Sequence, residues 1–142
     1  MHVVHAGEGP TVKWGPAGVL RIVAGADSTD GTFSLVEACE EPGSAAPLHV
    51  HHGEAEAFYV LDGQIELTCG EQTLTASAGD FVYTPKDVPH KYVVVGDKPA
   101  RVLLLFSRSG FESFFAEAGA QPADLPRLVE KYDMELLEPI GH

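Results

Sequence analysis

The chain has 142 residues and a formal net charge of −12 at pH 7, which favours a single domain and argues against nucleic acid or an anionic membrane as a partner. No apolar run approaches the roughly 20 residues that a membrane-spanning helix needs, and the first residues lack the basic start and apolar core of a signal peptide. Two cysteines are too few for a disulfide framework, so we expect Cys39 and Cys69 to be small, buried apolar residues of a cytoplasmic protein.

Short alternating segments separated by turns predict an all-β fold. Fifteen glycines and ten prolines supply many turns. A short strand is expected at residues 3–4, and longer strands at residues 19–24 and 32–39, which the turn-rich sequence ADSTDG joins. In the last of these strands Leu35 and Glu37 share one face, and we expect Glu37 to face solvent.

Two histidines and a glutamate stand close together in the segment 43–63. His49 and His51 lie two positions apart in an extended stretch, so their side chains share a face and their Cα atoms are roughly 6.5–7 Å apart. Glu56 begins the next predicted strand, and a short turn at residues 52–55 would bring its carboxylate beside the two imidazoles. Imidazole and carboxylate donors bind transition metals at about 2.0–2.2 Å, so the pattern predicts half of a metal site.

The strand that Glu56 begins, residues 56–61, is apolar on both faces. Phe58 and Val60 share the face of Glu56, and Tyr59 and Leu61 occupy the other. Such a pattern predicts a strand that is buried on both sides.

Strands of the same kind continue along the chain. We expect them at residues 65–69, 73–76, 81–84, 90–95 and 100–106. His90 begins one of them, and Tyr92 shares its face, so Tyr92 either lines a cavity beside the site or is an ordinary core aromatic residue. The recurring turns predict two antiparallel sheets that form a barrel.

After the last strand the composition changes, and helices are predicted. Apolar residues at i, i+3, i+4 and i+7 form one face of a short helix at 111–118, and a second helix is expected at 124–132. We therefore divide the chain into a barrel, residues 1–108, and a helical extension, residues 109–142, that packs on the barrel and closes or shields one mouth.

The spacing of these residues resembles the two sequence motifs of the cupin superfamily. The first motif is matched by Gly43, two histidines, one glutamate and Gly63, and the second by Gly79, Pro85 and a histidine. Asp87 stands where the second motif usually has glycine, and Val94 where asparagine is usual; neither is a ligand position. The metal ligands that the resemblance implies are His49, His51, Glu56 and His90.

A narrower resemblance covers most of the chain. The sequences PLHVHHGEAEAFYVLDG and SGFESFFAEAG are similar to those of small single-domain cupins related to quercetin 2,3-dioxygenases. The resemblance implies a jelly-roll barrel, or double-stranded β-helix, and a homodimer formed with the help of the N-terminal strand.

Three imidazoles and one carboxylate suit Fe, Mn, Co, Ni, Cu or Zn and suit Mg or Ca poorly. Four protein ligands also fill a tetrahedral ion, so a purely structural metal is one reading. Iron, manganese and nickel accept five or six ligands, which would leave room for a substrate. The residues expected around the ion suit a flat aromatic molecule, and they are Leu35, Phe58, Val60 and Tyr92.

The resemblance implies a mononuclear metal-dependent oxygenase that acts on a small aromatic or enolisable hydroxy-ketone, with Glu56 as the general base. The alternative is a cyclase, isomerase or dehydratase that tailors a polyketide-like molecule without O₂. The third hypothesis is a binding module without enzymatic activity. Each implies a small-molecule ligand and one divalent transition metal.

Overall fold

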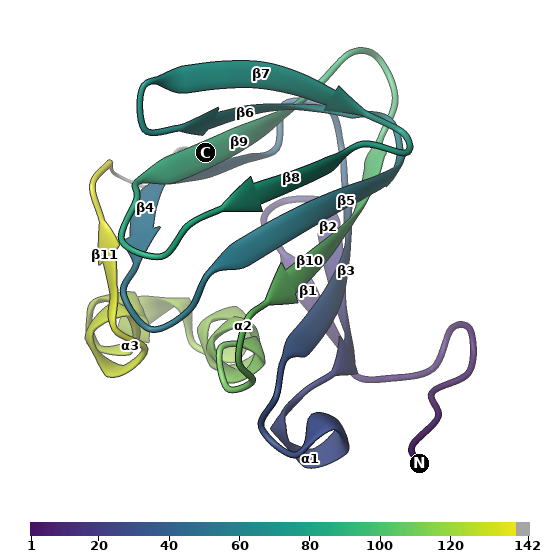
Figure 1. Ribbon diagram of the computed structural model, residues 1–142, viewed down its shortest axis with the longest axis vertical. Coiled ribbons are helices and arrows are strands. Elements are labelled where there is room, and N and C mark those ends of the chain that lie inside the picture. Colours follow the sequence, from purple (N-terminus) through teal and green to yellow (C-terminus); the bar gives the residue numbers. More distant parts are fainter. Residues whose placement is uncertain (139–142) are drawn as a thin grey trace.

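Two antiparallel β-sheets face each other, and two helices lie at one end of them (Figure 1). The structure is a computed structural model that describes residues 1–138. The larger sheet has the strand order β1 (Thr11–Trp14), β2 (Gly18–Ala24), β3 (Ser34–Glu40), β10 (Ala100–Phe106), β5 (Glu56–Asp62), β8 (Phe81–Thr84). The smaller sheet has the order β11 (Met134–Leu136), β4 (Ala45–His51), β9 (His90–Val95), β6 (Gln64–Cys69), β7 (Gln72–Ser77).

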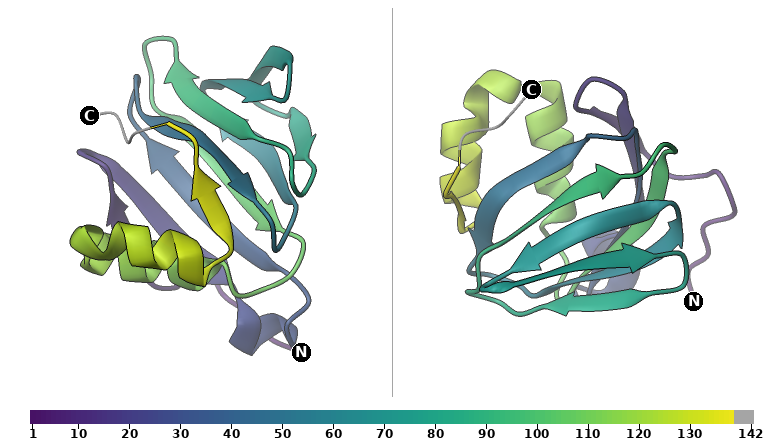
Figure 2. Two further views of the ribbon diagram at one scale, coloured as in Figure 1. Left: turned by 90° about the vertical axis from the view of Figure 1, so that its left-hand side faces the viewer. Right: turned by 90° about the horizontal axis from the view of Figure 1, so that it is seen from above.

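The strand order shows how the barrel forms from distant parts of the sequence. Strand β10 lies between β3 and β5, and β9 lies between β4 and β6, so each sheet interleaves early and late strands. Figure 2 shows the two layers from the side and from above. This arrangement confirms the predicted all-β jelly-roll barrel with short C-terminal helices.

Alternation along the strands decides which side chains enter the core. In β5, Phe58 and Val60 are buried, whereas Tyr59 on the opposite face is 43% exposed. The prediction that β5 is buried on both faces is therefore wrong. In β3, Val36 and Ala38 point inward, and Leu35 lies on the outward face with Glu37, whose carboxylate pairs with Arg21.

The turn between β5 and β6 fixes where the strand β5 ends. Gly63 has a φ of 76°, and a Cβ built there would lie 2.5 Å from the carbonyl oxygen of Pro99. Only glycine fits such a position without a shift of the backbone. The turn holds the register of β5, and the strand begins at Glu56.

The helical segment covers the end of the barrel where β10 finishes. Helix α2 (Glu112–Ala120) is followed by a short 3-10 helix (Pro122–Asp124) and by α3 (Leu125–Lys131), which leads into β11. The Trp14 ring packs edge-on against Phe115, with ring centroids 5.2 Å apart. Among residues 1–138, no helix combines the length and the hydropathy that a membrane crossing requires.

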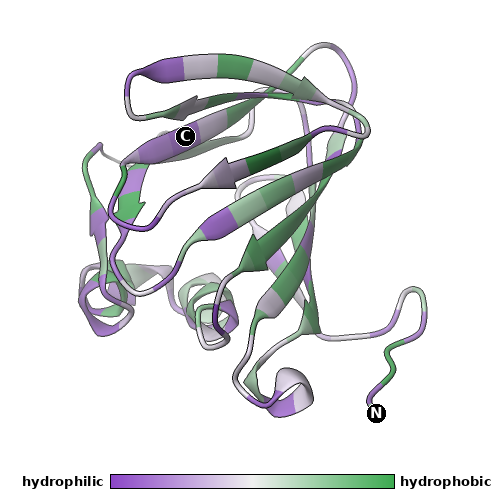
Figure 3. Cartoon of the chain, viewed as in Figure 1, coloured by the Kyte–Doolittle hydropathy of each residue, from purple (hydrophilic) through white to green (hydrophobic). Residues whose placement is uncertain are grey.

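Three local predictions were wrong. Residues 3–4 form no strand, and the first strand is β1. The sequence ADSTDG contains the short helix α1 (Ala26–Thr29), which begins where Ser28 and the backbone of Gly25 bond to each other. Cys39 is exposed because it alternates outward in β3, and Cys69 is half-buried. Colouring by hydropathy shows the mainly apolar character of β3, β10, β5 and β8 (Figure 3).

Candidate metal centre

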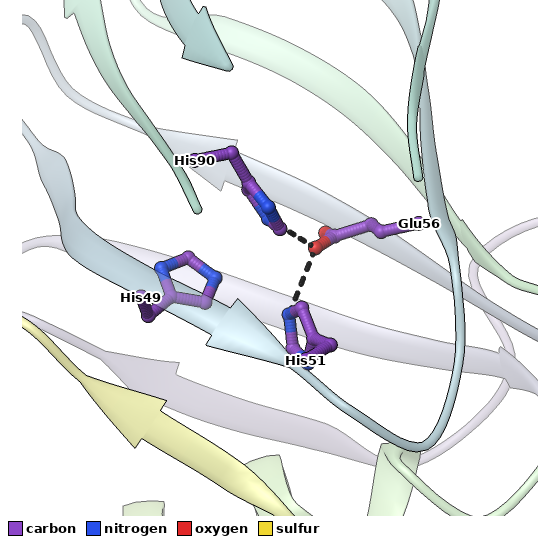
Figure 4. Close-up of side chains that lie close together, drawn as sticks. All are labelled: His49, His51, Glu56 and His90. Carbon is purple, nitrogen blue, oxygen red and sulfur yellow. Dashed lines mark hydrogen bonds and ion pairs between the residues drawn. The ribbon is translucent and has the colours of Figure 1, made fainter. Parts of the chain in front are cut away.

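Three separate strands bring the four predicted ligands together (Figure 4). His49 and His51 come from the end of β4, and His90 opens β9, whose first residue is paired with His49. Glu56 opens β5 in the opposite sheet and points toward the imidazoles. The centre is therefore built across the two sheets at one end of the barrel.

The spacing of the donor atoms fits one metal ion. One donor atom from each of the four residues lies within 4.8 Å of the others. Glu56 Oε1 is 3.1 Å from His90 Nε2 and 3.2 Å from His51 Nε2. An ion about 2.0–2.2 Å from each donor needs donor atoms no more than about 4.4 Å apart, so a contraction of a few tenths of an ångström closes the cage. The cluster could hold a metal.

Backbone carbonyls orient two of the three rings. His49 Nδ1 is 2.6 Å from the carbonyl oxygen of Pro47, and His90 Nδ1 is 3.4 Å from that of Val88. Each carbonyl can accept a hydrogen bond from an Nδ1–H group, which leaves Nε2 as the ring nitrogen that faces the other side chains of the cluster. Nε2 is the nitrogen that can bind an ion.

Sequence reasoning missed one residue of this centre, Glu54. Its carboxylate lies 3.1 Å from His51 Nδ1, and both side chains are buried. Glu54 belongs to the turn between β4 and β5, where no period in the sequence reveals which side chains point inward. The available signal was a second carboxylate two positions before Glu56.

Burial and the neighbouring charges act on each ionisable group of the cluster. Burial and the nearby His90 and His51 lower the pKa of His49 to about 4. Burial also opposes the charged form of His51, but the carboxylates of Glu54 and Glu56 outweigh it and raise the pKa to about 9. Glu56 is buried too, and hydrogen bonds from His51 and His90 outweigh that burial and hold its pKa far below the usual range.

Aromatic rings enclose the cluster. Phe111 packs edge-on against the His51 ring at 4.6 Å between centroids, and Phe106 lies 5.9 Å from the same ring. Phe58 lies 6.1 Å from His90. The four side chains are at most 9% exposed, so bulk water is largely excluded from the centre.

The predicted substrate-pocket residues lie in different places. Phe58 is beside the cluster, whereas Val60, two positions along β5, is fully buried in the core. The Tyr92 hydroxyl donates a hydrogen bond to Glu40, and burial, followed by that carboxylate, raises the pKa of Tyr92 well above its usual value. The assignment of Leu35 to the pocket was wrong, because its side chain lies on the outward face of β3.

The unusual Asp87 keeps the turn before His90 in the shape that glycine favours. Its φ is 68°, a left-handed conformation that aspartate tolerates better than most residues. The Asp87 carboxylate is 2.7 Å from His52 Nδ1, and Glu135 Oε1 is 3.3 Å from the other nitrogen of that ring. His52 therefore links this turn to β11.

Comparison with known proteins identifies the fold family. The family model of the cupin domain matches residues 36–106, half of the chain. The chain is a cupin. It is 34% identical over 91 residues to the quercetin 2,3-dioxygenase of Bacillus subtilis (strain 168), an alignment that covers 64% of this cupin and 27% of that enzyme. The cupin therefore spans about a quarter of the length of that relative.

Solved structures show the same fold. An RmlC-like cupin from Shewanella frigidimarina superposes with a TM-score of 0.68 at 17% identity, covering 80% of this chain and 96% of that one. The polyketide cyclase RemF from Streptomyces resistomycificus superposes with a TM-score of 0.65 at 22% identity, covering 76% of this cupin and 81% of the cyclase.

Proposed function

We propose that this cupin is a mononuclear metal-dependent dioxygenase of the quercetinase type, acting on a small aromatic or enolisable hydroxy-ketone. The observation that carries the proposal is the buried cluster of three imidazoles and one carboxylate. The 34% identity to a quercetin 2,3-dioxygenase supports the choice of reaction. His49, His51, Glu56 and His90 would hold one divalent transition metal.

The residues present fit such an ion. Imidazole nitrogen with carboxylate oxygen suits Fe, Mn, Co, Ni, Cu or Zn. When bound, the ion supplies Lewis acidity that lowers the pKa of a hydroxyl group of the substrate. This donor set does not choose among the six metals.

Glu56 is the group that would move the proton. Its Oε1 lies within 3.2 Å of the Nε2 atoms of His51 and His90, so it would be beside a substrate hydroxyl held by the same ion. It takes the hydroxyl proton on that carboxylate as a general base. The Phe106 and Phe111 rings exclude water from the deprotonated substrate, which would otherwise regain a proton from solvent.

The test is aerobic turnover of a flavonol by protein loaded separately with each of the six metals, followed as loss of flavonol absorbance. We expect loss with at least one metal and none under argon. Glu56→Gln should retain the metal on its three imidazoles and lose at least about 100-fold in rate, the usual contribution of a general base. No absorbance change with any metal would remove the assignment.

A second candidate is a metal-dependent cyclase, isomerase or dehydratase that works without O₂. The donor set is as compatible with this candidate as with the first. Imidazole and carboxylate also bind Zn, a metal that has no redox chemistry. Turnover of a polyketide-like substrate by the Zn-loaded protein under argon would support it and exclude the dioxygenase. Ligand binding without turnover under either condition would point to the third candidate, a binding module.

A further inference from the structure

The three imidazoles of the cluster differ in what holds their second nitrogen. His49 and His90 each face the backbone carbonyl of the residue two positions earlier. His51 instead faces a carboxylate, that of Glu54, three positions later in the turn between β4 and β5. A carbonyl is neutral, so only His51 has a charged partner on the side away from the cluster.

Among the described residues, His51 is the only one that forms an ion pair with Glu54. Glu54 is 5% exposed and forms no other ion pair or side-chain hydrogen bond with residues 1–138. A buried carboxylate without a partner costs several kcal/mol or is neutralised. Its burial beside His51 therefore calls for an explanation in terms of that ring.

The contact between the two residues is close but not aligned. Glu54 Oε1 and His51 Nδ1 are 3.1 Å apart and shut off from solvent, yet neither atom makes a hydrogen bond of good geometry with residues 1–138. The same ring is held at Nε2 by Glu56 at 3.2 Å. An ion between Nε2 and Glu56 would replace that second contact, so the ring could turn into line with Glu54.

We propose that Glu54 is a positioning residue that aligns the His51 ring for metal binding and increases the affinity of the centre for a divalent cation. The inference rests on the metal centre proposed above. A hydrogen bond to a carboxylate fixes the Nδ1–H tautomer and makes Nε2 a stronger donor.

The charge balance gives a second reason. With three neutral imidazoles, the carboxylates of Glu54 and Glu56 would balance the charge of a divalent ion. Without the charge of Glu54 the buried centre would carry +1, which is unfavourable in a region of low dielectric constant. The centre is thereby matched to a divalent ion.

The test compares Glu54→Gln with wild type in the dissociation constant for Co²⁺ and Zn²⁺, measured by competition with a chelator. The variant should bind about 10–100-fold more weakly, and the visible absorption of its bound Co²⁺ should shift. Glu112→Gln is the matched control, since Glu112 is also buried but accepts hydrogen bonds from the backbone of Ala26 and Gly110. It should bind within about twofold of wild type.

A measurement on the wild type removes any dependence on the folding of the variant. In the Zn-loaded protein, ¹⁵N NMR should show the His51 ring protonated at Nδ1, with a proton that exchanges slowly with solvent. A wild type that binds no ion would overturn the metal centre itself. Wild-type binding with an unchanged Glu54→Gln affinity, or a His51 ring without the Nδ1 proton, would overturn the role of Glu54 alone.

Discussion

The imidazole of His51 is in contact with more of the centre than any other side chain described above. Carboxylates lie against both of its nitrogens, and the rings of Phe106 and Phe111 pack on it. Those aromatic residues belong to the hydrophobic core, which extends through both sheets beyond the cluster. Loss of His51 should therefore abolish metal binding, whereas the core should keep the barrel folded at a lower free energy of unfolding, because buried Glu54 loses its partner.

His51→Ala should abolish metal binding while the barrel stays folded. In wild type, an ion at 100 times its dissociation constant should raise the free energy of unfolding by about 2.7 kcal/mol; in the variant the increase should vanish. Chemical denaturation with and without Zn²⁺ measures both. If the metal-free wild type and the variant are both unfolded, the ion has a structural role instead.

The residues of the centre show which parts of it the sequence could predict. His49, His51 and Glu56 could be placed together because extended backbone puts alternate residues on one face and a short turn returns the chain. His90 was placed by resemblance to a motif. Glu54 could not be found in either way, because the direction of a side chain in an irregular turn depends on packing that the local sequence does not encode.

At the scale of elements, helix α2 contacts the centre through the residue before it, Phe111. That ring is 3% exposed and lies against His51, Phe106, Phe114 and Phe115. The helix itself was predictable, since its apolar residues repeat with a helical period. The contact of this helical segment with His51 was not predictable. The helical period shows which residues share a face but not which part of the protein that face packs against.

Phe111→Ala should destabilise the protein by about 3 kcal/mol, as is usual when a buried phenylalanine is truncated. Because the ring also covers His51, bound Co²⁺ should exchange with a chelator faster than in wild type. Phe33→Ala is the control, since Phe33 is 38% exposed, and it should change neither quantity appreciably. Unaltered stability in the Phe111 variant would contradict the packing described above.

An ion pair on the outward face of the larger sheet joins β2 to β3. The hydrogen bond from Arg21, against partial burial, lowers the pKa of Glu37 below 4.5, with a smaller contribution from Arg101. A carboxyl whose pKa falls on folding stabilises the folded protein above its unfolded pKa, and that contribution is lost as pH drops through the folded pKa.

Glu37→Gln should therefore reduce the free energy of unfolding by about 0.5–1 kcal/mol at pH 7. The difference from wild type should shrink as the pH falls below 4.5, where wild type also loses the charge. Urea denaturation across this range measures it. A deficit that stays constant with pH would show that the carboxylate charge is not responsible.

At the scale of the whole molecule, the overall architecture was the most predictable feature. Strands 81–84, 90–95 and 100–106 were predicted with the bounds that the structure shows, because each is an apolar run with turn residues at its ends. The wrong predictions arose where one sequence pattern is compatible with two different structures. The sequence ADSTDG suits both a turn and a capped helix, and alternation in β3 fixed which residues share a face without showing which face is inward.

The homodimer implied by the family resemblance stays a prediction. The resemblance gives the N-terminal strand a part in its interface, and we expect the outward face of β5, β8 and β10 to add to it. Exposed Tyr59, Phe81, Tyr83 and Leu105 form an apolar patch there, on the same face of β10 as Arg101. A chain with a net charge of −12 repels its copies least at an uncharged apolar patch.

Sedimentation should give twice the monomer mass of 15.1 kDa. Phe81→Glu combined with Tyr83→Glu should yield a monomer that still binds metal, whereas Leu74→Glu, at a 43% exposed site on the other sheet, should remain dimeric. A wild type that sediments as a monomer at micromolar concentration contradicts the prediction.

The pairing of β11 with β4 sets an order of events during synthesis. Met134 lies opposite His51, and Leu136 lies opposite His49, so the outer edge of the strand that carries two of the four donors is covered by residues 134–136. The ribosome releases those residues after all four donors have already emerged. The four donors can thus come together before residues 134–136 cover that edge, and an ion that the centre could hold would meet it while it is still open.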